Sequence, residues 1–176
     1  FSAYPIIDAY RLLDEGGQLD DEFRERFKQF AAAAYYAQEE GAFNQAFARA
    51  AGLALAARTW PDLAEAPAWR AAAERVWDQW YSQRDTSENA ACYNGISLTF
   101  LFLLSDALDR TDRLQDPAVR RMFERFRDQV SPQGFMPEYG DSGDAQWAML
   151  HCWGNWVCAM ERAAATYHDP TYRWVA

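Results

Sequence analysis

Two kinds of helical segment alternate along this chain, and that alternation limits the fold more than any other feature. The first kind carries charged side chains on one face and aromatic or aliphatic side chains on the other, as surface helices do. Its members are residues 20–30, 69–80 and 118–129. The second kind carries at most one charged side chain per segment, and its members are residues 43–57, 93–108 and 146–160. A helix that is apolar all round is buried on all sides. The alternation therefore predicts helical hairpins, each made of an outer and an inner helix.

Helical periodicity covers almost the whole chain. Most of the prolines and glycines fall between the periodic segments, and no segment shows the sustained two-residue alternation of a strand. The expected helices are residues 4–14, 21–39, 43–58, 65–82, 91–109, 116–130 and 145–167. Asp20, Asp62 and Asp116 precede helices as N-caps, and Pro117 suits the first helical position. The predicted fold class is all-α.

The inner segments recur at a nearly constant interval. Asn44 and Asn94 are 50 residues apart, and Asn94 and His151 are 57 residues apart. Repeats of this length are typical of arrays of antiparallel helical hairpins. Such an array is a solenoid when it stays open and an α/α toroid when it curls into a ring. The chain holds too few hairpins to close a ring, so we expect an incomplete α/α toroid.

Hairpin topology places every connection from an outer to an inner helix at the same end of the array. These connections are "QEEGAFN", "SQRDTSENAACYN" and "SPQGFMPEYGDSGDAQW", and they are rich in carboxylates, amides and tyrosines. The connections at the opposite end, "TWPDLAEAP" and "DRTDRLQDP", have the composition of plain capped turns. A cleft built from loops on a rigid scaffold is therefore expected at one end only.

Charge and composition exclude several classes of protein. The net charge of −9 includes no basic stripe, which argues against a nucleic-acid partner. The longest uncharged apolar run is far shorter than the ~20 residues of a membrane span, so no membrane partner is expected. Three cysteines in apolar contexts argue against a disulfide framework and predict buried thiols.

The length of 176 residues suits one domain, and we expect residues 1–176 to form a single helical-hairpin domain. The chain begins with Phe1 and ends on "TYRWVA" without a terminal signal. We therefore expect a fragment of a longer multidomain chain. No signal peptide is visible, and the sequence does not indicate a compartment.

Four stretches in order resemble the toroid domain of heparinase II/III-like and alginate-lyase-like polysaccharide lyases. They are "FNQAFARAAGLALAARTWPDLAEAPAWRAAAERVW", "DTSENAACYNGISLTFLFLLSDAL", "SPQGFMPEYGDSGD" and "ATYHDPTYRWVA". The resemblance covers about residues 43–176. It implies β-elimination on a uronic-acid polysaccharide, in which one group neutralises the carboxylate and an acid–base pair moves protons. A periplasmic or secreted location would agree with that activity.

The resemblance also implies roles for individual residues. Tyr93 would be the acid–base tyrosine, and Asn44 would contact the substrate carboxylate. Glu88 and Asn89 would lie beside Tyr93 and either orient the reacting groups or neutralise the substrate carboxylate. The stretch "DTSENAACYNGISLTFLFLLSDAL" departs from the family at Cys92 and Asn94, one of which stands where relatives place a histidine. His151 is therefore the candidate histidine that could reach the cleft. The tryptophans of residues 147–156 and Tyr139 are candidates for stacking on sugar rings, and Asp141 for shaping the cleft. The candidate catalytic residues are Asn44, Glu88, Tyr93 and His151, and the candidate substrate-binding residues are Asn89, Asn94, Tyr139, Asp141, Trp147 and Trp153.

Each candidate also has a structural interpretation. A tyrosine at a helix start packs its ring in the core, and an asparagine there is a good cap. No metal or cofactor is expected. The expected partners are an anionic polysaccharide and the remaining domains of the parent chain. Two other functions stay open: a glycoside hydrolase that uses a carboxylate pair such as Glu88 and Asp141, and a non-catalytic helical-repeat module that binds a glycan or a protein.

Overall fold

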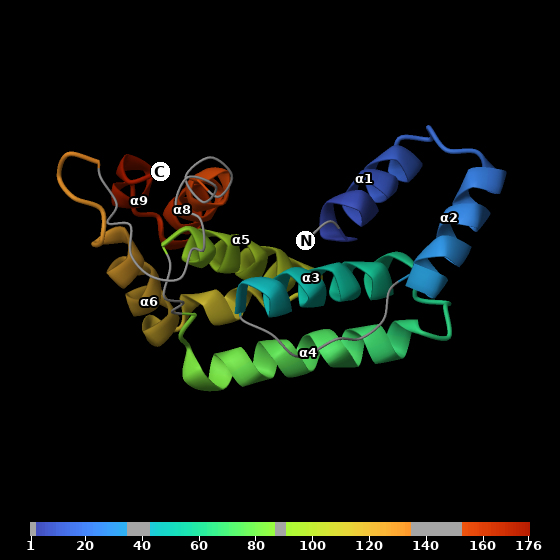
Figure 1. Cartoon of the computed structure of the whole chain (residues 1–176), viewed down its shortest axis with the longest axis horizontal. Coiled ribbons are helices and arrows are strands. Elements are labelled where there is room, and N and C mark those ends of the chain that lie inside the picture. Colours follow the sequence, from blue (N-terminus) through green and yellow to red (C-terminus); the bar gives the residue numbers. More distant parts are fainter. Residues whose placement is uncertain (1–2, 35–42, 87–90, 135–152) are drawn as a thin grey trace.

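The computed structural model describes residues 3–34, 43–86, 91–134 and 153–176, and these residues contain helices and no strand. The prediction of an all-α fold is confirmed. The α-helices are α1 (Ala3–Glu15), α2 (Asp21–Ala34), α3 (Phe43–Thr59), α4 (Ala66–Gln83), α5 (Ala91–Ala107), α6 (Pro117–Arg127), α8 (Trp153–Tyr167) and α9 (Thr171–Trp174), with a 3-10 helix η1 (Thr111–Gln115) between α5 and α6 (Figure 1). Among the described helices none has the length and hydropathy needed to cross a membrane.

Helices α3, α5 and α8 lie side by side and run in the same direction. The Thr99 hydroxyl of α5 donates to the Asn155 carbonyl of α8 at 2.6 Å. Two turns further along, Arg162 of α8 donates to Asp106 of α5 at 2.8 Å. Both contacts join residues 56 positions apart, so the two helices are parallel. Helices α3 and α5 also begin at the same end of the molecule (Figure 1), and Arg58 of α3 donates to the Asp106 carbonyl at 3.2 Å.

Helix α1 continues this row beside α3, displaced along it by about half a helix. Its first residue, Ala3, lies against Gly52 in the middle of α3, where an added Cβ would come 2.8 Å from the Ala3 Cβ. Further along α1, the Tyr10 ring lies 5.3 Å from the Trp60 ring, just after the end of α3. The order of contacts shows that α1 runs in the same direction as α3. The row of inner helices is thus α1, α3, α5 and α8.

The amphipathic helices cover this row from outside. Helix α4 runs opposite to α3 (Figure 1), and its Trp80 ring meets Phe47 of α3 edge-on at 6.1 Å. Helix α6 lies over both α5 and α8, because its Phe123 ring contacts Phe102 at 5.1 Å and Tyr167 at 5.6 Å. The buried side chains include tryptophans of α4 and phenylalanines of α5 and α6, together with many alanines of α3 and α8. The predicted pairing of outer with inner helices is therefore present.

Two of the three predicted N-caps are confirmed. The Asp20 carboxylate accepts the Phe23 N–H at 2.7 Å, and the Asp116 carboxylate accepts the Ala118 N–H at 2.8 Å. The prediction for Asp62 is wrong: helix α4 begins four residues later, with Pro67 in its first turn, because proline suits the start of a helix. Asp62 instead forms an ion pair with Lys28 of α2.

Several boundaries differ from the sequence-based expectation. Helix α5 ends at Ala107 rather than residue 109, because Asp109 adopts a left-handed φ of 56°. Helix α6 ends at Arg127. The short elements η1 and α9 were missed, since five and four residues are too few to show a helical period. The prediction of buried thiols is wrong for Cys158, which is free and exposed.

Candidate functional site at the amino-terminal end of the inner helices

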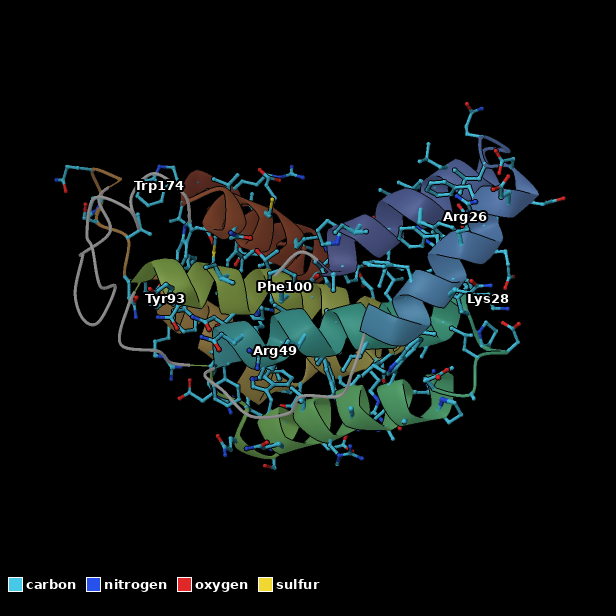
Figure 2. All side chains as sticks on the ribbon, turned by 45° about the vertical axis from the view of Figure 1, so that its right-hand side comes forward. Arg26, Lys28, Arg49, Tyr93, Phe100 and Trp174 are labelled. Carbon is cyan, nitrogen blue, oxygen red and sulfur yellow. The ribbon has the colours of Figure 1, made fainter. Side chains whose placement is uncertain are left out.

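The amino termini of the parallel helices α3, α5 and α8 lie at one end of the inner row. Helix α3 begins at Phe43, α5 at Ala91 and α8 at Trp153. Tyr93 marks the start of α5 at the end where α3 also begins (Figure 2). The three polar connections identified in the sequence lead into these three helix starts. This end is therefore the place where the topology gathers the candidate site residues.

Two predicted site residues are buried amides on neighbouring helices. Asn44, the second residue of α3, is 6 % exposed, and Asn94, the fourth residue of α5, is 1 % exposed. Arg58 of α3 contacts Asp106 of α5, 48 positions further along. Asn44 and Asn94 both lie in the first turn of their helices, and the two helices begin at the same end of the molecule (Figure 1). The two amides thus occupy nearly the same level of the inner row.

Tyr93 precedes Asn94 in the first turn of α5 and is half-buried. A half-buried tyrosine keeps part of its ring in the protein while its polar end can reach a ligand or solvent. The structure therefore brings Asn44, Tyr93 and Asn94 to the same end of the inner row.

The remaining predicted residues are not placed by the structure. Trp153 is the first residue of α8, but its side chain is outside the described set. The others lie outside the described residues altogether: Glu88, Asn89, Tyr139, Asp141, Trp147 and His151.

Trp156, at the far end of the tryptophan-rich stretch, belongs to the core. It is 3 % exposed, and its Nε1–H donates to the Val175 carbonyl at 2.9 Å. Its backbone lies against Gly95 of α5, where an added Cβ would come 3.1 Å from the Trp156 nitrogen. Trp156 therefore fixes the start of α8 between α5 and the carboxyl-terminal residues, and it offers no ring face to a sugar.

The connection from α4 to α5 is anchored to the outer helix α6. The Asp85 carboxylate accepts a hydrogen bond from the Arg125 guanidinium at 2.6 Å, and the Thr86 side chain, fully buried, donates to the Met122 sulfur at 3.6 Å. Asp85 is the first acidic residue of the "DTSEN" stretch. Asp85 thus forms an ion pair with Arg125, which fixes the chain to α6 just before the start of α5.

The electrostatic character of this end follows from the helix directions. The unpaired N–H groups of a helix amino terminus act as a partial charge of roughly +0.5. Three parallel helices that begin at one end of the molecule add their fields there, so an anionic group is favoured at this end.

Sequence reasoning missed a recess between α4 and the segment that connects α5 to α6. It has a volume of about 450 Å³ and is lined by Trp77, Asp78, Tyr81, Asp109, Arg110, Asp112 and Arg113. Arg110 donates to Asp78 at 2.6 Å, and Arg113 lies 3.6 Å from Asp112. The interpretation of "DRTDRLQDP" as a plain capped turn was therefore incomplete. The available signal was the alternation of aspartate and arginine in that stretch.

Comparison of the chain with protein-family models, with curated proteins and with solved structures finds no significant match. In the described ranges, no group of three or more histidine, cysteine, aspartate or glutamate side chains is arranged to hold a metal ion.

Proposed function

We propose that this chain is part of an α/α toroid that binds a uronic-acid polysaccharide and cleaves it by β-elimination. The observation that carries the proposal is the placement of Asn44, Tyr93 and Asn94 at one end of three parallel inner helices. The sequence resemblance and the direction of the helices support the same ligand, a chain of sugars that carry carboxylates.

The toroid part of the proposal rests on the order of the helices. The row α1, α3, α5 and α8 is parallel, and α4 and α6 cover it from one side. A toroid is built by continuing this pattern around a ring, in which every inner helix begins at the same end. The inner row of the chain has the directions that such a ring requires.

Binding of a uronate at this end has a physical basis. A carboxylate gains from the combined field of three helix amino termini and from amide N–H donors. Asn44 and Asn94 are 6 % and 1 % exposed and already have partners within the protein, so in this proposal they hold the starts of α3 and α5 in position around the ligand. Neutralising the carboxylate increases the acidity of the adjacent C5–H, which is the bond that must break first.

The proposed reaction moves one proton to the protein and one to the product. A base removes the C5 proton, the electron pair of the C5–H bond forms the C4–C5 double bond, and the C4–O bond breaks. The departing oxygen takes up a proton from an acid. We assign the acid–base role to Tyr93, because it is half-buried at the same end as the two amides.

The test is incubation of the chain with alginate, glucuronan and glycosaminoglycans while the ultraviolet absorbance of the new C4–C5 double bond is followed. The expected result is a rise in absorbance with at least one of these polymers. New reducing ends without that absorbance would show hydrolysis and overturn the elimination chemistry. Binding without any cleavage would show a non-catalytic module, and neither binding nor cleavage would overturn the polysaccharide as ligand.

A further inference from the structure

One face of α5 is turned away from the outer helix α6. The ring of Phe102 in α5 contacts Phe123 of α6, with the ring centroids 5.1 Å apart. Tyr93 precedes Phe102 by nine residues, which is two and a half turns at about 100° per residue, so the two side chains point to opposite sides of α5. Ile96, three residues after Tyr93, lies on the same side and is also half-buried. Tyr93 and Ile96 therefore belong to a face of α5 that points away from α6.

Helix α3 has a corresponding face that is turned away from the outer helix α4. The Phe47 ring of α3 meets the Trp80 ring of α4 at 6.1 Å. Arg49 follows Phe47 by two residues, a rotation of about 200°, so its side chain leaves α3 on the side opposite α4. Gln45, four residues before Arg49, lies on the same side. Gln45 is exposed and Arg49 is half-buried.

These two faces lie on the same side of the inner row. Helices α4 and α6 belong to one outer layer, because the Tyr81 hydroxyl near the end of α4 donates to the Asp116 carboxylate just before α6 at 2.9 Å. Helices α3 and α5 are neighbours in the row that this layer covers. Side chains of α3 and α5 that point away from the outer layer therefore share one surface. We call it the open face of the inner row, and its residues are Gln45, Arg49, Tyr93 and Ile96.

Helix α1 limits the open face along α3. Gly52 follows Arg49 by three residues on the same side of α3, and a Cβ added there would come 2.8 Å from the Ala3 Cβ of α1. Ala56, one turn further, is buried. Toward the start of α3 the exposed Gln45 shows that this side of the helix is open. Arg49 is therefore the last residue on this side of α3 before α1 covers it.

Arg49 is also a charge in an unusual place. It is the one charged residue among the first eight residues of α3, α5 and α8, the helices that begin at this end. Burying part of a guanidinium on an inner helix costs free energy unless the group has partners. Arg49 interacts within the protein, and its guanidinium carries five N–H donors, more than one partner uses. Arg49 thus brings a permanent positive charge to the open face.

We infer, on the basis of the proposed function, that Arg49 binds the carboxylate of the uronate unit and so selects an acidic sugar over a neutral one. The planar guanidinium matches a carboxylate with two parallel N–H···O bonds. Arg49 lies one turn further from the start of α3 than Tyr93 lies from the start of α5 (Figure 2). A sugar unit bound on the open face therefore has the proton-transfer group and the cation on the same side.

The test is equilibrium binding of two matched ligands, measured by isothermal titration calorimetry. One is an oligosaccharide prepared from alginate or glucuronan, and the other is the same oligosaccharide with its carboxylates reduced to alcohols. Every chain also carries Tyr93→Phe, so that the ligand is not cleaved. Arg49→Gln is expected to weaken binding of the acidic oligosaccharide about tenfold or more and to leave binding of the reduced one unchanged. Arg49→Lys keeps the charge without the planar fork and is expected to lose less.

Arg58→Gln is the matched control, because Arg58 is an exposed arginine at the other end of α3, where it lies 3.4 Å from Asp109. It is expected to leave both affinities unchanged. Helical circular dichroism and the midpoint of thermal unfolding establish that each variant is folded.

The outcomes separate the role of Arg49 from the proposed function. If Arg49→Gln binds the acidic oligosaccharide as tightly as the parent chain, or loses both ligands equally, Arg49 does not bind the carboxylate and the proposed function stands. If the parent chain binds the acidic oligosaccharide no more tightly than the reduced one, or binds neither, a uronate is the wrong ligand and the role of Arg49 is overturned with it.

Discussion

Gly95 of α5 lies directly against the backbone of Trp156 in α8. A Cβ on Gly95 would come 3.1 Å from the Trp156 nitrogen and 3.2 Å from its Cα. These are backbone atoms within a helix that is itself anchored by hydrogen bonds to α5 and to Val175, so they cannot give way as a flexible side chain would. The distance between two inner helices, at the end where the candidate site lies, is therefore set by the absence of a side chain.

We expect Gly95→Ala to lower the free energy of unfolding by about 1–3 kcal/mol, because the added methyl group forces α5 and α8 apart. Chemical denaturation at neutral pH measures this change. Gly154→Ala is the matched control, since no atom lies within 4 Å of its added Cβ. It is expected to leave the stability unchanged or to raise it by up to ~1 kcal/mol, the helix preference of alanine over glycine. Equal effects of the two substitutions would contradict the close packing.

Under the proposed function, Tyr93→Phe is expected to lower kcat by roughly 10²–10⁴-fold, because it removes the only group assigned to proton transfer. The ring and its packing remain, so thermal unfolding is expected to be unchanged. The double-bond absorbance of the product measures the rate. Tyr4→Phe is the control, since Tyr4 is also half-buried but lies on α1, beside the middle of α3. Full activity of Tyr93→Phe would remove Tyr93 from the mechanism.

The Asp116 carboxylate links three parts of the outer layer, and its stabilising effect is expected to depend on pH. It accepts hydrogen bonds from the Ala118 N–H at 2.8 Å, and from the Tyr81 hydroxyl and the Arg84 guanidinium at 2.9 Å each. These bonds lower the pKa of Asp116 below its usual value, with the backbone N–H contributing most. The stabilisation is therefore fully present above the ordinary pKa of aspartate and is lost as the pH falls through the lowered value.

Asp116→Asn is accordingly expected to lower the midpoint of thermal unfolding by several degrees at pH 7. The difference from the unmodified chain is expected to stay constant down to about pH 5 and to shrink below about pH 4. Asp112→Asn is the control, because Asp112 is 75 % exposed and lies 3.6 Å from Arg113. A difference that grows on acidification would contradict the assignment.

The hydrogen bond from Trp156 to Val175 is expected to hold the carboxyl-terminal residues on α8. Trp156→Phe removes this donor and leaves a buried carbonyl without its partner, which we expect to cost about 1–3 kcal/mol of unfolding free energy. Trp174→Phe, made at an exposed ring, is expected to change stability by less than ~0.5 kcal/mol. Denaturant titration of both variants gives the comparison. Similar losses in the two would show that ring size, and not the hydrogen bond, is responsible.

The alternation of amphipathic and apolar segments was enough to predict the hairpins, because burial leaves a strong periodic signal in helices of this length. The predicted outer and inner helices correspond to α4 and α6, and to α3 and α5. Short elements such as η1 left no such signal. The error at Asp62 has a different cause, since an aspartate before a helix has the same appearance whether it caps that helix or binds Lys28 of another hairpin.

The candidate site was only partly predictable. Asn44, Tyr93 and Asn94 were identified from the sequence, and the parallel inner helices place them at one end. Trp156 was first interpreted as a possible sugar platform, because an aromatic residue on an apolar helix gives no indication of what lies above its ring. The recess beside Arg110 was missed because its walls come from segments that are distant in the sequence, and residue spacing reports only on neighbours within one helix.

The sequence by itself determined the helices, their outer or inner character and the repeat of about fifty residues, because these depend on the local pattern of burial. The tertiary structure alone decided which helices touch and how closely, since those contacts depend on side chains that meet across the core. Gly95 shows the difference: within its own helix a glycine only weakens the segment, and its role becomes apparent only once the Trp156 backbone lies against it.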